Sequence, residues 1–411
     1  MKYPLRIGIF GFYSSRNFGD TSIQMAVIDN LRRCFPDAEL VGICPDPIDT
    51  ERTHGIPAFP LFGQGWDRHT GCYHAPVEKA EQNGRLSITK RIFSKLTDVR
   101  QRLTWLYNVA LYCRSIDLLL ISGGGQLSDF WGGPWRFPFF LMIWSLFSRL
   151  NGAKVAVFGI GWDGLSTRLG KRFAFTALRL AHYRVFRDTG TTKRLVAEGL
   201  HLENRVCPDP AFGLSTPTVA VPNNRSKVIM VCPISAHAWL VQANASYNNY
   251  IEVLADTCGQ WLREGYTVQL CTSQPAMDGP VAQYLVTQLC AISFHSDRIE
   301  VLDAKSVSEY LIFARAADIV VASRLHALIL SAVAETPLVA ISPGRKVSQL
   351  MTDLGLDDYC MELSALRAEP LHNAVSNVLI NKTKLRGDLM KSLMIYRSEL
   401  KIHYDIIAEL L

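Results

Sequence analysis

Short apolar runs alternate with amphipathic segments along most of the chain. The first run, residues 6–12, is followed by a polar loop that contains Gly19 and Asp20, and then by a helix expected at about residues 21–34. The next expected strand is residues 39–44. Apolar runs joined by helices in this way are typical of a doubly wound parallel sheet, whose strands are buried on both faces.

A second series of the same kind begins after a polar, proline-containing stretch at residues 215–226, which we interpret as a linker. The chain length of 411 residues also favours two domains. We therefore predict an α/β protein with two doubly wound, Rossmann-like domains facing a cleft. The expected domains are residues 1–214 and 227–378, with a C-terminal helix at residues 379–411 that can cross back to the first domain.

Two stretches depart from the alternation. Residues 45–84 lose periodicity and are rich in Pro, Gly, His and aromatic residues, so we expect a long loop there. Residues 85–114 indicate one or two helices in which Lys90, Arg91 and Lys95 lie among apolar side chains. Such a helix is either a solvated face or a peripheral contact with the inner face of an anionic membrane.

Composition narrows the class of protein. A hydrophobic content of 48% and a charged content of 19% are those of a globular protein. The net charge of +6 fits an anionic ligand but is too diffuse to predict nucleic-acid binding. The ten cysteines show no CxxC spacing and the N-terminus has no signal-peptide pattern, so we expect a cytoplasmic protein. The most apolar long stretch, residues 137–150, is interrupted by Arg149 and is shorter than the roughly 20 residues that span a bilayer.

Candidate chemistry lies at the carboxyl ends of the expected strands, where doubly wound sheets bind ligands. In the second domain an apolar run leads into Ser323, Arg324, Leu325 and His326, and a helix follows. A guanidinium beside a helix N-terminus suits a phosphate or carboxylate, and an imidazole can transfer a proton near neutral pH. Because an arginine at a buried strand end needs an anion, we predict that Arg324 binds one in a ligand.

Strand ends of the first domain carry polar and glycine residues in the same way. These residues are Asn17, Gly19, Asp20, Gly123, Gly124, Gly125, Gly161, Arg187 and Asp188. Glycines let a ligand approach the backbone, although this spacing is not the dinucleotide fingerprint. Asp20 and Asp188 are also suitable helix N-caps, so their role stays open at this point. No cluster with metal-ligand spacing is visible, and we expect no metal.

These motifs, taken in order, resemble the polysaccharide pyruvyl transferase family. The resemblance runs over about residues 6–356. It rests on Asn17-Phe18-Gly19-Asp20, Ser122-Gly123-Gly124-Gly125, Gly159-Ile160-Gly161, Arg187-Asp188, Pro208-Asp209-Pro210-Ala211-Phe212 and Ser323-Arg324-Leu325-His326-Ala327, with Pro337 and Lys346. It implies a fold similar to two-domain (GT-B-like) glycosyltransferases. The chain departs from the family pattern at Gly161-Trp162-Asp163 and just before Lys346.

The resemblance implies transfer of the enolpyruvyl unit of phosphoenolpyruvate to two hydroxyls of a sugar, as a cyclic ketal, with release of phosphate. The implied phosphoenolpyruvate site consists of Arg187, Arg324, Leu325, His326 and Lys346. We expect His326 to protonate the methylene carbon, Asp20 or Asp188 to accept protons from the sugar, and no cofactor beyond this co-substrate. The acceptor would be a glycan or lipid-linked sugar, beside Asn17 and the glycines.

Two other functions fit the same strand-end residues. One is a nucleotide-sugar glycosyltransferase of the same architecture, which would use arginine and helix N-termini to bind a diphosphate. The other is a non-catalytic phospho-ligand-binding partner in envelope polysaccharide assembly, with residues 85–114 as its working surface. Release of phosphate would indicate the pyruvyl transferase and release of nucleotide the glycosyltransferase. Binding without release of either product would indicate the non-catalytic partner.

Overall fold

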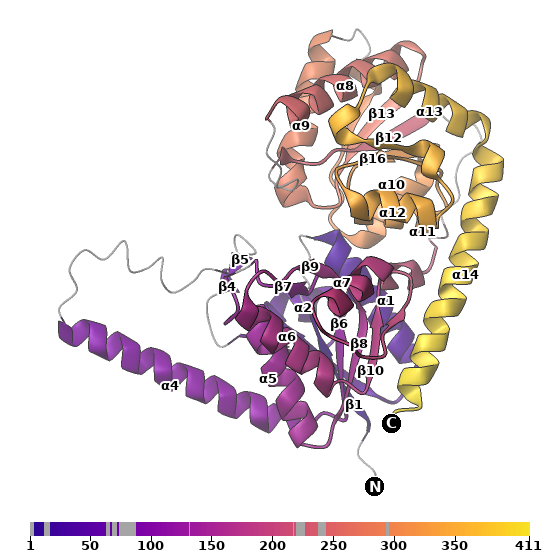
Figure 1. Ribbon diagram of the computed structural model, residues 1–411. Coiled ribbons are helices and arrows are strands. Elements are labelled where there is room, and N and C mark those ends of the chain that lie inside the picture. The colour runs from indigo at the N-terminus through magenta and orange to yellow at the C-terminus, as the bar shows by residue number, and fades with distance from the viewer. Residues whose placement is uncertain are drawn as a thin grey trace. The chain divides into compact units, whose positions relative to one another are not determined.

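The computed structural model describes residues 4–11, 17–62, 66–67, 72–73, 88–130, 132–216, 218, 227–236, 244–292 and 296–411. The chain divides into two compact units (Figure 1). The first unit consists of Met1–Ser15, Ile23–Gly213 and Glu399–Leu411, and the second of Arg16–Ser22 and Leu214–Ser398. Most of the expected linker, residues 215–226, lies outside the described residues.

The first unit is built on a seven-stranded parallel sheet with the strand order β11-β10-β8-β6-β1-β2-β3. Its strands are β1 (Arg6–Phe10), β2 (Glu39–Cys44), β3 (Ala58–Pro60), β6 (Leu118–Ser122), β8 (Lys154–Ile160), β10 (Tyr183–Phe186) and β11 (Arg205–Val206). The chain winds outwards from β1 to β3 and then restarts with β6 on the other side of β1. The switch point therefore lies between β1 and β6, where such sheets bind ligands.

Helices and two small strand pairs complete the first unit. The helices are α1 (Phe18–Cys34), whose first turn belongs to the second unit, α2 (Pro47–His54), α4 (Ile88–Cys113), α5 (Phe137–Leu150), α6 (Arg168–Leu180) and α7 (Thr189–Ala197). The strand pairs are β4 (Trp66–Asp67) with β5 (Cys72–Tyr73), and β7 (Leu127–Ser128) with β9 (Trp162–Gly164). A short 3-10 helix, Pro210–Gly213, ends the first part of the unit.

The second unit has a six-stranded parallel sheet with the order β14-β13-β12-β15-β16-β17, which is the 3-2-1-4-5-6 order of a Rossmann sheet. Its strands are β12 (Val228–Cys232), β13 (Thr267–Cys271), β14 (Ile299–Leu302), β15 (Ile319–Ala322), β16 (Leu338–Ser342) and β17 (Cys360–Glu362). Its helices are α8 (Asn244–Arg263), α9 (Pro275–Ile292), α10 (Val307–Ala316), α11 (Leu325–Val333), α12 (Arg345–Asp353), α13 (Ala368–Ile380) and most of α14 (Lys382–Ala408). The two sheets confirm the predicted α/β class.

Continuous burial of the central strands explains why the sequence forms parallel sheets. Every residue of β6 and of β15 is buried, so helices must cover both faces of each sheet. In the first unit the ring of Phe140 on α5 meets Trp105 on α4 edge to face, with centroids 5.0 Å apart. In the second unit Tyr250 and Trp261 of α8 are fully buried against the sheet. Each such side chain contributes about 1.5–3 kcal/mol through burial.

Helix α1 begins three residues earlier than predicted. The helix starts at Phe18, and Asn17 is its N-cap: the Asn17 Oδ1 accepts a hydrogen bond from the Gly19 amide at 3.0 Å. The Asn17 carbonyl accepts the first backbone bond, from Thr21 at 3.0 Å. Asp20, which the sequence analysis names as a suitable cap, instead lies inside the first turn. Asparagine is a favoured N-cap, but Gly19 is a poor helix former, so the sequence pattern indicated a loop at residues that form the first turn.

The expected long loop at residues 45–84 contains regular structure in its described part. Helix α2 occupies Pro47–His54, with Asp46 as N-cap (Oδ1 accepts from the Asp49 amide at 3.3 Å) and Gly55 in the left-handed region (φ 62°) after its end. Proline at the first position and glycine after the last are the usual helix boundaries, so the signals were present. Residues 85–114 contain one long helix, α4, rather than two.

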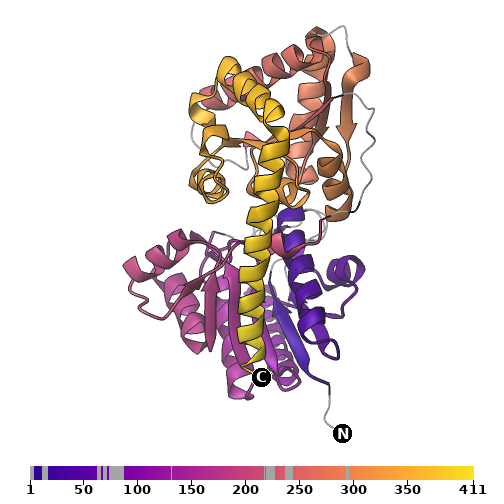
Figure 2. The same cartoon turned by 90° about the vertical axis from the view of Figure 1, so that its right-hand side faces the viewer.

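The C-terminal helix α14 is one unbroken helix of 27 residues (Figure 2). Its residues to Ser398 belong to the second unit, and residues from Glu399 onwards belong to the first. In the first unit the Tyr404 ring packs on Phe158 at 4.7 Å, and the Tyr183 hydroxyl lies 2.6 Å from the His403 Nδ1. This end of α14 is therefore part of the first unit's core.

Candidate active site

The turn between β15 and α11 is firmly held within the second unit. The Ser323 amide donates to the Cys232 carbonyl on β12 at 3.2 Å, and the Ser323 Oγ lies 2.9 Å from the buried Tyr250 hydroxyl. Helix α11 begins at Leu325, directly after Arg324, without a side-chain cap. Because the first-turn amides of a helix have no partner inside the helix, this terminus suits an anion.

Arg324 already has a carboxylate partner, which the sequence analysis missed. The Arg324 Nε and Nη2 donate to the two Asp278 oxygens at 2.6 and 2.8 Å, and Asp278 is fully buried in the first turn of α9. The Ser235 amide also donates to Asp278 at 2.9 Å. Asp278 therefore supplies the anion that a buried arginine needs, and binding of a ligand anion by Arg324 stays a prediction. Among the described residues none accepts a hydrogen bond from the Arg324 Nη1, which remains available to a ligand.

The first turn of α1 lies against the imidazole of His326. The Phe18 amide donates to the Ser273 carbonyl, after β13, at 3.0 Å, which ties this turn to the second unit. A Cβ atom built on Gly19 would lie 2.5 Å from the His326 Nδ1, so only glycine permits the observed approach. The position of the half-buried His326 ring therefore depends on the backbone of α1.

Asn17 and Asp20 belong to the same turn. The Asn17 Nδ2 donates to the Asp20 Oδ2 at 2.7 Å. This hydrogen bond orients the half-buried Asp20 carboxylate, which directly follows Gly19 in the chain. Residues 1–214 were expected to form one domain, but Arg16–Ser22 cluster with the second unit. The first turn of α1 clusters with the second unit, and the rest of the helix belongs to the first. The structure thus brings Asn17, Gly19 and Asp20 together with His326.

Lys346 follows the neighbouring strand of the same sheet. Strand β16 pairs with β15 and ends at Ser342, whose hydroxyl accepts from the Gly344 amide at 3.3 Å before α12 begins. Lys346 is an exposed residue in the first turn of α12, yet atoms packed near its ammonium desolvate it and lower its pKa. The order of β15 and β16 places Lys346 and Arg324 at one edge of the sheet.

Arg187 is the buried cation of the first unit's strand ends. It follows β10, its side chain is 7% exposed, and its guanidinium lies against Gly161, where an added Cβ would be 2.5 Å from the Nε. Two carboxylates are near: the Nη1 is 3.6 Å from the Asp209 Oδ2 and the Nε is 3.9 Å from the Asp188 Oδ2. Neither distance is that of a hydrogen bond. Within the described part of the chain, the donors of Arg187 are thus oriented by charge but not engaged.

Asp188 acts as a helix cap. Its Oδ1 accepts from the Thr191 amide at 2.6 Å and its Oδ2 from the Thr191 hydroxyl at 2.9 Å, at the start of α7. Of the two roles left open for this residue, the structure supports capping. Both oxygens are occupied in the same turn of the helix.

The glycines after β6 and β8 form one connected segment. The Gly161 amide donates to the Gly124 carbonyl at 2.9 Å, and Gly123 has a φ of 136°, which favours glycine. An added Cβ on Gly125 would lie 1.4 Å from the Asp163 Oδ2, so the exposed Asp163 occupies the space that a side chain would need. The structure brings Gly124 and Gly161 together and places Asp163 against Gly125.

A second buried carboxylate, Asp129, supports this edge and was missed by the sequence analysis. It accepts four hydrogen bonds: from the Ser166 amide and hydroxyl, both at 2.9 Å, and from the Thr167 amide and hydroxyl at 2.8 and 2.5 Å. Burial opposes the ionisation of Asp129, but these four bonds outweigh it and lower its pKa. Asp129 thereby fixes the connection between β9 and α6.

The predicted site residues fall into two groups, one in each unit. The first unit holds Gly123, Gly124, Gly125, Gly161, Arg187 and Asp188. The second unit holds Asn17, Gly19, Asp20, Arg324, Leu325, His326 and Lys346. Within each unit these residues lie at the carboxyl ends of the strands. The meeting of the two groups around one ligand stays a prediction.

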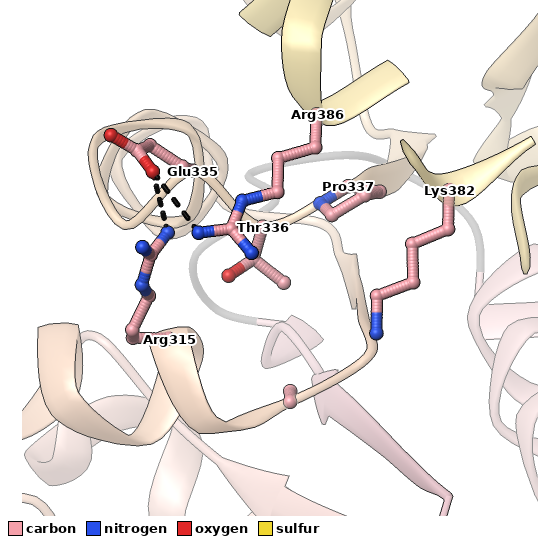
Figure 3. Close-up of a pocket in the computed structure, with 7 residues that line it drawn as sticks. Arg315, Glu335, Thr336, Pro337, Lys382 and Arg386 are labelled. Carbon is pink, nitrogen blue, oxygen red and sulfur yellow. Dashed lines mark hydrogen bonds and ion pairs between the residues drawn. The ribbon is translucent and has the colours of Figure 1, made fainter. Parts of the chain in front are cut away.

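A small pocket of the second unit lies at the amino ends of β15 and β16, away from these residues. It is lined by Arg315, Ala317, Glu335, Thr336, Pro337, Lys382 and Arg386 (Figure 3). Its cations are paired: Glu335 accepts from Arg315 at 2.7 Å and from Arg386 at 3.3 Å, and Lys382 pairs with Asp318. These ion pairs attach the start of α14 to the sheet, so we interpret the pocket as structural.

Within the ranges that the structure describes, no three His, Cys, Asp or Glu side chains are grouped so that they could hold a metal ion. The helices in those ranges include none with the length and apolarity needed to cross a membrane.

Comparison with solved structures shows which fold the chain has. The lipopolysaccharide outer core galactosyltransferase WaaB, in its apo form, superposes with a TM-score of 0.53 at 11% identity, over 98% of this chain and 100% of that one. The UDP-GlcNAc 2-epimerase from Neisseria meningitidis bound to UDP-GlcNAc gives 0.57 at 9% identity, over 99% and 100%. The UDP-GlcNAc 2-epimerase from Methanocaldococcus jannaschii gives 0.55 at 9% identity, over 90% and 92%. The fold is thus GT-B-like, with two Rossmann-like sheets.

Comparison of the sequence itself gives one match. The family model described as "Polysaccharide pyruvyl transferase" matches residues 17–345, which covers most of the chain and begins at Asn17, the cap of α1. No curated protein sequence matches the chain.

Proposed function

Because this chain belongs to the polysaccharide pyruvyl transferase family, we propose that it transfers the enolpyruvyl unit of phosphoenolpyruvate to two hydroxyls of a sugar, as a cyclic ketal. The sugar would belong to a polysaccharide, a cell-wall polymer or a lipid-linked oligosaccharide. Phosphate is the second product. The proposal extends the family assignment to a donor, an acceptor class and roles for individual residues.

The observation that carries the proposal is the construction of the β15–α11 turn. The Arg324 guanidinium, fixed by Asp278, and the uncapped start of α11 present donors at one strand end, and His326 lies in the first turn of α11. Phosphoenolpyruvate has a phosphate and a carboxylate, both of which suit such donors. Lys346 at the neighbouring strand end adds a cation, and Leu325 contributes its backbone amide.

Arg187 supports the proposal from the first unit. Its charge is offset by Asp188 and Asp209, but neither carboxylate lies at hydrogen-bond distance, so a ligand anion could accept from its donors. We assign it to the phosphoenolpyruvate anions, together with Arg324. Asn17, Gly161 and the glycines after β6 would line the acceptor side, where glycine backbones permit close approach of a sugar.

In the proposed reaction, His326 donates a proton to the methylene carbon, C3, so that C2 becomes oxocarbenium-like. The first sugar hydroxyl adds to C2 and loses its proton. The bond between C2 and the phosphate oxygen then breaks, and the second hydroxyl closes the ring with loss of its proton. Of the two hydroxyl protons, one replaces the proton that C3 received and the other leaves with the phosphate.

We assign the acceptance of hydroxyl protons to Asp20 in preference to Asp188. Both carboxylates were candidates, but Asp188 has both oxygens bonded to Thr191 as the cap of α7. The Asp20 carboxylate is half-buried, is oriented by Asn17 and follows Gly19, which touches His326. An acid and a base at one strand end would serve the two proton transfers of the reaction.

One assay tests the proposal against its alternatives. The purified chain is incubated with a glycan acceptor and either phosphoenolpyruvate or nucleotide sugars, and phosphate and nucleotide release are measured. We expect acceptor-dependent phosphate release, and a product heavier than the acceptor by one pyruvate less one water. Nucleotide release without phosphate would establish the glycosyltransferase alternative, which the GT-B-like fold also accommodates. Binding with neither product would identify the non-catalytic partner.

A further inference from the structure

One face of α4 carries an exposed apolar stripe with a cation at each end. Leu103, Tyr107 and Leu111 are 61, 63 and 40% exposed. Exposed Arg100 lies three residues before the stripe, and exposed Arg114 follows it by three, immediately after the helix. Spacings of three and four residues place Arg100, Leu103, Tyr107 and Leu111 on one side of the helix, and Arg114 directly follows its end.

The opposite side of α4 is packed on the first unit, so the stripe is the outward face. Trp105, Val109 and Cys113 are buried, and the Trp105 ring contacts Phe140 of α5 (Figure 1 shows α5 beside α4). Fold stability therefore explains the buried side but gives no reason for three large exposed apolar residues in a row. Contiguous exposed apolar residues of this kind mark an interaction surface.

We propose that this face of α4, defined by Arg100, Leu103, Tyr107, Leu111 and Arg114, docks on an anionic lipid bilayer. The charge of the helix selects this occupant. Residues 88–113 contain five cationic residues and one acidic residue, and in the described part of the chain neither Arg100 nor Arg114 forms an ion pair. Leucine and tyrosine between arginines are typical of helices that lie in the membrane interface, where an amphipathic tyrosine ring is favoured.

A second protein chain suits this face less well. A stable protein interface buries about 1,200–2,000 Å² and has few charges at its centre. The stripe offers three side chains on a single helix, bordered by two exposed cations, which is a small area for a protein partner. A bilayer needs only shallow insertion of the apolar side chains and contact of the arginines with headgroup phosphates.

Vesicle flotation tests the proposal. The full chain is mixed with vesicles of phosphatidylglycerol and phosphatidylethanolamine, or of phosphatidylcholine alone, and the bound fraction is measured at low and high salt. We expect binding to the anionic vesicles only, weakened by salt. The triple variant Leu103→Ser, Tyr107→Ser, Leu111→Ser should lower the binding constant by tenfold or more. The pair Arg100→Gln, Arg114→Gln should lower it about 25-fold, or about fivefold for each cation.

Matched controls use residues that are equally exposed elsewhere. Met394→Ser with Ile395→Ser removes two exposed apolar side chains of α14, and Arg172→Gln with Arg179→Gln removes two exposed cations of α6. Both controls should bind as the wild type does, and circular dichroism should show that every variant is folded. Absence of vesicle binding, or equal losses in the controls, would overturn the proposal. So would concentration-dependent dimerisation that the triple variant abolishes, because a second copy would then cover this face.

Discussion

The two arginines of the candidate site are held in different ways, and this difference sets their expected roles. Arg324 is locked in a bidentate pair with the buried Asp278, so its orientation is fixed before any ligand binds. Arg187 lies between two carboxylates at distances longer than hydrogen bonds, so its donors can turn to a ligand. A prearranged donor reduces the ordering cost of binding, while an unengaged buried donor gains most from a ligand anion.

The first prediction concerns Asp278 as a positioning residue for Arg324. Asp278→Asn removes the charge that holds the guanidinium, so Arg324 should lose its fixed orientation. We expect KM for phosphoenolpyruvate to rise about tenfold or more with a smaller change in kcat, and the free energy of unfolding to fall by about 3–5 kcal/mol. Steady-state kinetics and urea unfolding measure the two effects. The exposed Asp303→Asn is the control, and a KM unchanged in Asp278→Asn would contradict the positioning role.

A second prediction concerns the contact between Gly19 and His326. Gly19→Ala would place a methyl group 2.5 Å from the His326 Nδ1, so the imidazole must move. Displacement of a reacting group by about 1 Å costs about 100-fold, so kcat should fall by that order. Thermal stability should change little, because alanine is the better helix former. Gly279→Ala in α9, where an added Cβ meets no atom, should leave kcat unchanged. A normal kcat in Gly19→Ala would show that the contact between α1 and His326 does not matter for turnover.

At the scale of elements, α14 is attached to the second unit by a network of charges. Glu335, just after α11, adopts a φ of 56°, which is strained for a residue other than glycine. Its carboxylate accepts from Arg315 of α10 and from Arg386 of α14 (Figure 3). In this conformation one carboxylate pairs with both helices. The network is structural, since it lies at the strand ends opposite to those of the predicted site residues.

The third prediction is the pH dependence of this network. Burial of Glu335 opposes its ionisation, but the bonds to Arg315 and Arg386 outweigh burial and lower its pKa from the ordinary value of 4.5. Its contribution to stability is therefore complete above pH 4.5 and is lost as the pH falls through the lower, folded-state pKa. Glu335→Gln should destabilise the fold by about 1–3 kcal/mol at pH 7. Between pH 7 and 3 the unfolding free energy of Glu335→Gln should fall less than that of the wild type. Glu203→Gln, at an exposed position, is the control. Parallel pH curves would refute the assignment.

Most strands could be predicted from the sequence because parallel strands that are buried on both faces appear as continuous apolar runs. Most helices could be predicted as the amphipathic segments between these runs. Helix α2 was missed because its residues are charged and polar, and its boundaries are marked only by Asp46, Pro47 and Gly55. The start of α1 was misplaced because Gly19 was interpreted as part of a loop. That glycine is needed for its contact with His326, a residue more than 300 positions away, and no local pattern can indicate such a contact.

The same limit applies to the candidate site. Arg187, Arg324 and His326 could be located because each directly follows an apolar run. Asp278 also follows a strand, β13, so its position alone could have marked it as a candidate site residue. Its pairing with Arg324 depends on how the start of α9 lies relative to the end of β15, which no local sequence pattern indicates. The capping role of Asp188 was among the alternatives, and only the two bonds to Thr191 decide in its favour.

At the scale of the whole molecule, the chain passes between its two units more than once. The first turn of α1 clusters with the second unit and the last turns of α14 cluster with the first. Each unit is therefore completed by a segment that is distant in sequence. A cut between the two sheets near Gly213 would leave the first unit without the part of its core that α14 supplies.

A fourth prediction tests the contribution of α14 to the first unit. Tyr404 is 1% exposed and packs on Phe158 of β8, so Tyr404→Ala should create a cavity beside the central strands. We expect the free energy of unfolding to fall by about 3–5 kcal/mol. Ile402→Ala, at a position that is 58% exposed, should change it by less than about 0.5 kcal/mol. Equal effects of the two substitutions would mean that the end of α14 is not part of this core.

The turnover of His326→Ala with phosphoenolpyruvate and a glycan acceptor tests the central claim most directly. Acceptor-dependent phosphate release is measured for the wild type and the variant, and phosphoenolpyruvate binding is measured by calorimetry. If His326 protonates C3, turnover falls by about 100-fold or more while phosphoenolpyruvate still binds. Undiminished turnover in His326→Ala would contradict the account.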